Sequence, residues 1–175
     1  QGKHDEATAI YLQTTEINEG AFGPDHPEVA VSLGDRARIL HSQGKLEEAD
    51  PLFLRAIEIQ EKAFGPDHVG VASSLHNRAS LLLAQAKYDE ADSLFVRAIE
   101  IKEKACGPDH PHVAISLENR ASVLGNLGNL EEAGPLLARA IEIQEKALGP
   151  DHPSLATNLG SRANLLKAQV WEKSF

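Results

Sequence analysis

The tetrapeptide Gly-Pro-Asp-His stands at residues 23–26 and returns at 65–68, 107–110 and 149–152. Each copy begins 42 residues after the previous one, with no insertion or deletion between them. A fixed period of this length is the signature of a repeat architecture. Stacked repeats build an extended concave surface and have no single central pocket. The spacing therefore predicts a repetitive scaffold whose function lies in binding.

Each period contains two stretches in which apolar residues recur with helical spacing. In the second period, Leu33, Ala37 and Leu40 follow one another at intervals of four and three residues, which places them on one helical face. Gly44 suits the left-handed turn that follows a helix, and residues 46–64 carry a second apolar stripe. Applied along the chain, the pattern predicts helices at about 3–22, 27–43, 46–64, 69–85, 88–106, 111–127, 130–148 and 153–171, with no strand.

The tetrapeptide separates one pair of helices from the next. Glycine ends a helix and proline cannot continue one, so Gly-Pro predicts a helix C-terminus. The aspartate that follows is expected to cap free backbone N–H groups of the next helix. One turn within a period departs from the pattern, because Ala86 stands where Gly44 stands one period earlier, and we expect this turn to be stiffer or slightly altered. The four aspartates are Asp25, Asp67, Asp109 and Asp151.

Composition limits the classes of function. The chain has 175 residues, of which 42% are hydrophobic and 25% charged, as in an ordinary globular domain. Its formal net charge of −9 argues against binding nucleic acid, which needs clustered Lys and Arg, and favours basic or polar peptides. No apolar run approaches the roughly 20 residues of a membrane span. The single cysteine, Cys106, excludes an internal disulfide, which agrees with a reducing, cytoplasmic location; Cys106 itself is expected to be a small core residue.

The order of large and small residues within a period resembles that of the tetratricopeptide repeat (TPR). Leu33, Ala37, Gly44, Ala49 and Phe53 match the family pattern, and most of it recurs in the next two periods. The longer unit, with its Gly-Pro-Asp-His element, is similar to repeats of the kinesin-light-chain type. The resemblance implies an all-α fold, a right-handed α-solenoid of about eight helices in antiparallel pairs.

We therefore expect a single TPR-like domain over residues 1–175, with individual repeats at about 1–26, 27–68, 69–110, 111–152 and 153–175. Because the sequence lacks Met and begins with Gln, this domain is expected to be a piece of a longer chain. Trp171 and Phe175, where the repeat pattern ends, are expected to cover the last helix or to meet another chain. With a net charge of −9, the protein is expected to be mainly monomeric, with weak end-to-end self-association.

An arginine occupies a helix position where the family pattern has leucine, in four successive periods. A charged group at a half-buried site needs a partner. Glutamates recur with the same period on the alternate helices, so we expect a ladder of Arg–Glu pairs that stabilises the fold; ligand binding by these arginines is the alternative. The arginines are Arg36, Arg78, Arg120 and Arg162, and the glutamates are Glu16, Glu58, Glu100 and Glu142.

Positions that change from period to period are free of the requirements of stacking. On the first helix of each period they fall at i, i+4 and i+7, in a stripe distinct from the core stripe. The TPR resemblance implies that these helices line a concave groove that contacts the partner; neutral variation on a solvated face is the alternative. The expected partner-binding residues are Arg38, His41, His76, Asn77, Ser80, Leu83, Glu118, Asn119, Ser122, Asn126 and Asn164.

No residues favour catalysis or a bound cofactor. The sequence contains neither phosphate-binding glycine motif and no nucleophile elbow. Successive Asp-His pairs are expected about 16–20 Å apart, two helix widths, whereas metal ligands lie about 2 Å from one ion, so we expect no metal site. The predicted function is a non-catalytic scaffold that binds a peptide or protein. The alternatives are a ligand-sensing arm of an NB-ARC-type nucleotide switch and a self-associating structural solenoid.

Overall fold

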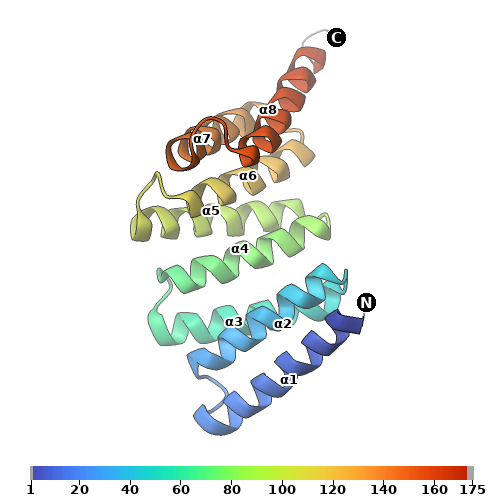
Figure 1. The fold of residues 1–175 in the computed structure, drawn as a ribbon, viewed down its shortest axis with the longest axis vertical. Helices are drawn as coiled ribbons and strands as arrows, with labels where there is room; N and C mark the ends of the chain where they lie inside the picture. Colours follow the sequence, from blue (N-terminus) through green and yellow to red (C-terminus); the bar gives the residue numbers. More distant parts are fainter. Residues whose placement is uncertain (1, 173–175) are drawn as a thin grey trace. The chain divides into compact units, whose positions relative to one another are not determined.

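The computed structural model describes residues 2–172, and within them the chain forms eight α-helices and no strand (Figure 1). Each helix begins and ends within one residue of its predicted bounds, so the all-α class and the helix pattern are confirmed. No helix in this part of the chain is both long and apolar enough to span a membrane. The helices are α1 (Gly2–Phe22), α2 (Pro27–Ser42), α3 (Leu46–Phe64), α4 (Val69–Ala84), α5 (Tyr88–Cys106), α6 (Pro111–Asn126), α7 (Leu130–Leu148) and α8 (Pro153–Glu172).

The chain divides into two compact units, Gln1–Ala86 and Lys87–Phe175. Unit 1 contains α1 to α4 and unit 2 contains α5 to α8, and within each unit every helix packs against the next one in sequence. We call α2, α4, α6 and α8 the A-type helices and α1, α3, α5 and α7 the B-type helices. Short links between successive helices make these neighbours antiparallel, so each unit is a stack of helix pairs of the solenoid type.

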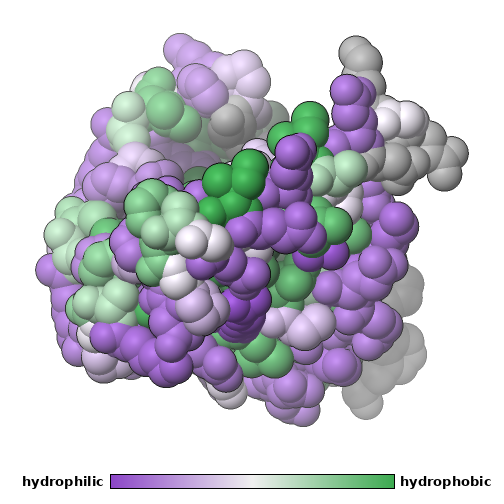
Figure 2. Space-filling view, turned by 90° about the horizontal axis from the view of Figure 1, so that it is seen from below, coloured by the Kyte–Doolittle hydropathy of each residue, from purple (hydrophilic) through white to green (hydrophobic). Residues whose placement is uncertain are grey.

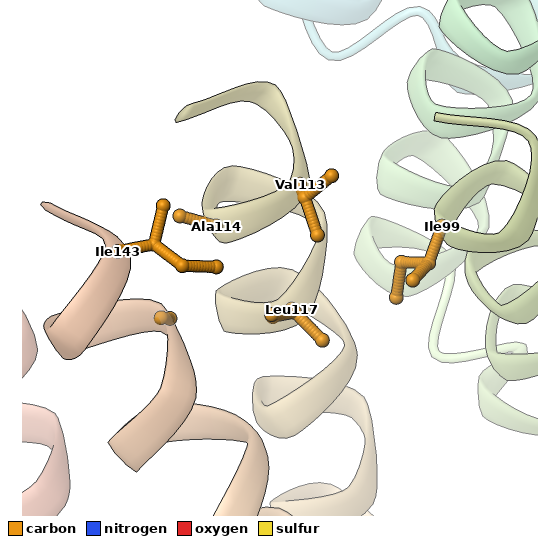
Figure 3. Packing of buried hydrophobic residues seen from close by; sticks show 6 residues of the cluster. Ile99, Val113, Ala114, Leu117 and Ile143 are labelled. Carbon is orange, nitrogen blue, oxygen red and sulfur yellow. The ribbon is translucent and has the colours of Figure 1, made fainter. Parts of the chain in front are cut away.

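The core of each unit uses the repeated apolar positions. In unit 1, Phe53 is fully buried against Ala37, Ala49 and Leu81, because small side chains at the helix crossing leave room for the ring. In unit 2, α6 is held on two sides (Figure 3). Val113 lies on the side that faces Ile99 of α5, and Ile143 of α7 points towards Ala114. In the view of Figure 2, hydrophobic residues on the surface lie in separate groups among hydrophilic ones.

The histidine of the tetrapeptide, and not its aspartate, caps the following helix. The Nδ1 atoms of His26, His68 and His110 each accept a hydrogen bond from the backbone N–H two residues later, at 3.1–3.3 Å. The predicted aspartate cap is therefore wrong: the residue with extended backbone just before each of these helices is the histidine. Asp25 and Asp109 lie one residue too early, and their carboxylates approach Lys62 and Lys146 at 3.6 and 3.7 Å.

The turns within a period need a left-handed residue. Gly44 and Gly128 have φ values of 74° and 80°, which glycine adopts without steric cost. Ala86 fills the same place between α4 and α5 with a φ of 58°, and it is the only non-glycine residue with positive φ in the described part of the chain. A β-carbon in this region costs roughly 1–2 kcal/mol, so the turn that joins the two units is strained.

Candidate functional site

A hollow of about 430 Å³ lies in unit 2 between two A-type helices, α6 and α8, and the B-type helix α7. We call it the α6–α8 hollow. Four of the predicted partner-binding residues line it: Glu118, Asn119, Ser122 and Asn126. The other lining residues are Ala121, Gly125, Leu130, Leu137, Thr157, Asn158, Ser161 and Leu165.

Glu118 is held by two side-chain amides from the neighbouring helices. Its Oε1 accepts hydrogen bonds from Nε2 of Gln144 on α7 and from Nδ2 of Asn158 on α8, the latter at 2.7 Å. Asn158 also donates to Oε1 of Gln144 at 2.6 Å, which closes a ring of three polar side chains. Burial raises the pKa of the Glu118 carboxyl, and the hydrogen bond from Asn158 partly opposes this. The ring fixes the carboxyl group where three helices meet.

A second space of about 390 Å³ adjoins the first, and we call it the adjoining hollow. Glu118, Thr157 and Asn158 line both spaces, so the polar ring stands at their junction. The remaining wall of the adjoining hollow is largely apolar and comes from the start of α6 and the end of α7. Its other lining residues are Pro111, Ile115, Gln144, Ala147 and Leu148.

Unit 1 has a smaller hollow at an overlapping place, two repeat periods earlier in the sequence. This α2–α4 hollow measures about 190 Å³ and includes Arg38 and Asn77 of the predicted set. Nη2 of Arg38 lies 3.0 Å from Oδ1 of Asp35, one turn away on the same helix. The charge that borders the α2–α4 hollow is thus already paired within α2. Gln60, from α3, lines it as well, whereas the equivalent Gln144 of unit 2 lines the adjoining hollow.

Around the larger hollow, unit 2 carries smaller side chains than unit 1 at three equivalent positions. In unit 1 these positions have the large side chains of arginine, histidine and phenylalanine. In unit 2 the same positions have serine, glycine and leucine. A void remains where a smaller side chain leaves neighbours without a contact. The pairs are Arg38 and Ser122, His41 and Gly125, and Phe53 and Leu137.

The other predicted partner-binding residues lie outside these hollows. His41 of α2 is half-buried, and burial lowers the pKa of its imidazole. On α4, His76, Ser80 and Leu83 are also half-buried, and Ser80 Oγ donates a hydrogen bond to the carbonyl oxygen of His76 at 3.0 Å. Asn164 is exposed on α8.

The prediction of Arg–Glu pairs is wrong, because the arginines pair with aspartates. Nε of Arg78 lies 2.8 Å from Oδ1 of Asp50, and Nε of Arg120 lies 2.8 Å from Oδ1 of Asp92. Each arginine therefore reaches an aspartate 28 residues earlier, on the preceding B-type helix. The glutamates named above are exposed. Sequence reasoning used the glutamate period and overlooked this second carboxylate.

The pairs stop where that aspartate is missing. Thr8 stands 28 residues before Arg36, and Gly134 stands 28 residues before Arg162. The buried Nε of Arg36 has no hydrogen-bond partner, and Arg162 is exposed. Among the described residues, this Arg–Asp ion pair is thus present once in each unit, between α3 and α4 and between α5 and α6.

One polar position on the B-type helices escaped the sequence analysis. Its residues are Asn18, Gln60, Lys102 and Gln144, and each side chain forms a hydrogen bond with the next A-type helix. Nζ of Lys102 donates to Oγ of Ser116 at 2.8 Å, and burial lowers the pKa of this ammonium to about 8. The signal for the position was a polar residue that recurs within an otherwise apolar stripe.

Two further expectations concern helix ends. Cys106 is exposed, so its assignment to the core is wrong: the corresponding residues Phe22, Phe64 and Leu148 are exposed as well. The expected cap of Trp171 and Phe175 lies outside the described side chains. On α8, Leu159 and Leu166 are exposed, and on α1 Ile10 and Ile17 are exposed.

Comparison with known families gives one match that covers nearly the whole chain. The sequence profile of the Tetratricopeptide repeat matches residues 1–62, 36–104, 71–124 and 112–169. A search of curated protein sequences gives no match.

Similar folds occur among solved structures. A kinesin-light-chain-like protein of Podosopora anserina with nearly identical TPR-like repeats is 26% identical, over 99% of this chain and 82% of that one, with a TM-score of 0.82. BtubC (BKLC) from P. vanneervenii is 24% identical, over 87% of this chain and 60% of that one, with a TM-score of 0.77. The first TPR of Spaghetti (RPAP3), solved with the HSP90 peptide SRMEEVD, is 20% identical, over 79% and 93%, with a TM-score of 0.59.

Proposed function

Because the chain belongs to the tetratricopeptide repeat family, we propose that it is a non-catalytic scaffold that binds a protein or peptide along its A-type helices. The observation that carries this proposal is the α6–α8 hollow. Residues that vary between repeats line this hollow, whereas the helices around it contain the residues that recur in each repeat. Fold alone does not fix function, and the chemistry of this space supports the proposal.

The lining of the α6–α8 hollow suits an extended peptide. Leu137 and Leu165 are almost fully buried and form an apolar floor. Asn119 and Ser161 are more accessible and lie on the same space. A side-chain amide both donates and accepts hydrogen bonds, so it can bind the backbone of an extended segment. Apolar lining with a few placed polar groups is typical of binding pockets.

Site-specific crosslinking tests the proposal. A photo-reactive amino acid is introduced at Arg38 or Ser122, which are exposed beside the two hollows, or at Glu58 or Glu142, which are exposed on B-type helices. Each variant is mixed with a cell lysate and irradiated, and the crosslinked proteins are identified. We expect one partner to be crosslinked at least tenfold more strongly from the A-type positions. Equal or stronger crosslinking from the B-type positions would refute the proposal.

A pair of alanine variants separates binding from stability. Asn77 and Asn119 each line one hollow and are half-buried. Replacing both with alanine should weaken binding of the crosslinked partner and leave the melting temperature nearly unchanged. A lower melting temperature with unchanged binding per folded molecule would make these residues structural.

End-to-end self-association stays a second proposal, supported by the exposed apolar side chains of α1 and α8. Sedimentation at rising protein concentration tests it, and a constant monomer mass would contradict it. The sequence of the complete gene product decides the sensor-arm alternative, because a nucleotide switch would contain a phosphate-binding loop.

A further inference from the structure

Glu118 is the only charged residue among the described residues that line the α6–α8 hollow or the adjoining hollow. Both of its hydrogen-bond partners, Gln144 and Asn158, are neutral amides. An ionised carboxylate that is partly removed from water and has no cation beside it is destabilised. The site therefore holds a negative charge that a cation from outside can neutralise.

The surroundings of Glu118 suit a long side chain better than a bare ion. Leu130, Leu137 and Leu165 give the α6–α8 hollow an apolar floor. Lysine and arginine carry their charge on an apolar stem, which packs along such a surface. A volume of about 430 Å³ lies within the range of pockets that bind small molecules, about 300–1,000 Å³. It has room for one long side chain and the backbone that bears it.

We propose that the α6–α8 hollow binds a lysine or arginine side chain of the partner segment, with its cationic group beside the Glu118 carboxylate and its stem on the leucine floor. This inference rests on the proposed function and names the chemistry of its partner. An acidic segment would place like charges together at Glu118 and is disfavoured. The net charge of −9 adds long-range attraction for a basic segment.

Unit 1 supports the assignment by contrast. Gly34 stands where Glu118 stands in unit 2, so the α2–α4 hollow has no carboxylate at this point. Its own acid, Asp35, is already paired with Arg38. Ser122 replaces that arginine in unit 2, which leaves Glu118 without a basic residue one turn away. The unpaired acid and the free space thus occur together in unit 2.

Titration with single-residue probes, followed by NMR, tests the inference on the 175-residue chain. The probes are N-acetyl-arginine methylamide, N-acetyl-lysine methylamide, the uncharged N-acetyl-norleucine methylamide, and putrescine as a free amine. We expect the two basic probes to shift the side-chain amide signals of Gln144 and Asn158, with affinities at least tenfold above that of the norleucine probe. Raising the salt concentration from 50 to 500 mM should weaken the binding of the basic probes.

Two variants remove the charge in different ways. Glu118→Gln keeps an oxygen that can accept from both amides, and Ser122→Arg places a cation one turn after Glu118, as Arg38 is placed in unit 1. We expect each to weaken binding of the basic probes at least tenfold. Glu100→Gln removes the same charge from an exposed position of α5 that lines neither hollow, and it should change the affinity less than twofold.

Several results would overturn the inference: no binding of the basic probes, equal binding of the norleucine probe, undiminished binding by Glu118→Gln, or tighter binding of putrescine than of either peptide-like probe. The last would indicate a site for free amines. If the probes fail while the crosslinks arise from Arg38 and Ser122, the scaffold function stands and only the basic-segment inference falls. If the probes bind as expected while crosslinks arise from Glu58 and Glu142, the proposed function falls.

Discussion

The α2–α4 hollow and the α6–α8 hollow share six equivalent lining positions in the two units, and yet one has less than half the volume of the other, about 190 against 430 Å³. The helices α2 and α6, and likewise α3 and α7, begin and end at equivalent residues, and α4 and α8 begin at equivalent residues. The difference comes from side chains that the repeat does not fix: Ser122, Gly125 and Leu137 are smaller than their counterparts in unit 1. Repeating residues therefore determine the scaffold, and varying residues determine what the scaffold can bind.

The largest expected effect compares the core residues of the two hollows. Phe53→Ala removes a fully buried ring between Ala37, Ala49 and Leu81 and should destabilise the chain by about 3–5 kcal/mol. Leu137→Ala removes a smaller side chain that already borders a hollow, and about 2–3 kcal/mol is expected. Urea unfolding followed by circular dichroism measures both. An equal loss in the two variants would contradict the looser packing of unit 2.

The second comparison is between two arginines of unit 2. Arg120 pairs with Asp92, and both side chains are about three-quarters buried, with 22% and 25% of their surface exposed. Arg120→Ala leaves this largely buried carboxylate without its partner, so we expect a loss of about 1–3 kcal/mol, between that of an exposed pair and that of a fully buried one. Arg162 is exposed, with Gly134 at the matching position, and Arg162→Ala should cost less than about 0.5 kcal/mol. Similar losses would show that the aspartate does not stabilise the fold.

A third prediction uses the polar position that differs between the units. Lys102→Gln introduces the residue that the neighbouring periods have at this position, Gln60 and Gln144, and removes a buried ammonium. The pKa of Lys102 is lowered from 10.5 to about 8, chiefly by burial. The unfolded chain therefore binds more protons between these values, and the wild-type protein gains stability as the pH rises through this window.

Below pH 8 the wild-type protein carries the full cost of the charged group. The variant exchanges the hydrogen bond of the ammonium with Ser116 for a neutral one, of the kind that Ser74 makes to Gln60, and we expect a net gain of about 1 kcal/mol at pH 7. Above the ordinary lysine value the advantage should disappear. Unfolding both proteins at pH 7 and at pH 10.5 measures this difference, and a gain that does not change with pH would contradict the role of burial.

The smallest expected effect concerns the turn between α4 and α5. Ala86→Gly relieves the positive φ of 58° and should stabilise the chain by about 0.5–1 kcal/mol, because the relief exceeds the added flexibility of the unfolded state. The reverse change in unit 1, Gly44→Ala, should destabilise by about 1 kcal/mol. Thermal unfolding of the two variants provides the measurement. A loss of stability in Ala86→Gly would show that this turn is not strained.

Much of the fold followed from local pattern. Leu33, Ala37 and Leu40 predicted a helix face, and Gly-Pro predicted each helix end, because both signals act within one or two turns of the chain. The cap was missed because Asp and His are neighbours in every tetrapeptide, and only the backbone geometry decides which of them faces the helix. The partner of Arg120 was missed because two carboxylates recur with the same period.

The hollow could not have been predicted in the same way. Its lining comes from three helices, and its size depends on the small side-chain volumes of Gly125, Ser122 and Leu137. Pattern analysis placed Glu118 and Asn119 on a variable stripe, but it could not bring Gln144 and Asn158 to them. These contacts depend on how α7 and α8 pack, which no single helix encodes.

Exchanging the three small residues of unit 2 for those of unit 1 tests the central claim most directly. The variant Ser122→Arg, Gly125→His, Leu137→Phe keeps residues that the same fold already accommodates at Arg38, His41 and Phe53. We expect its melting temperature to be unchanged and its affinity for N-acetyl-arginine methylamide and for the crosslinked partner to fall at least tenfold. A folded variant that binds both within twofold of the wild-type affinity would show that the α6–α8 hollow is not where this protein binds its partner.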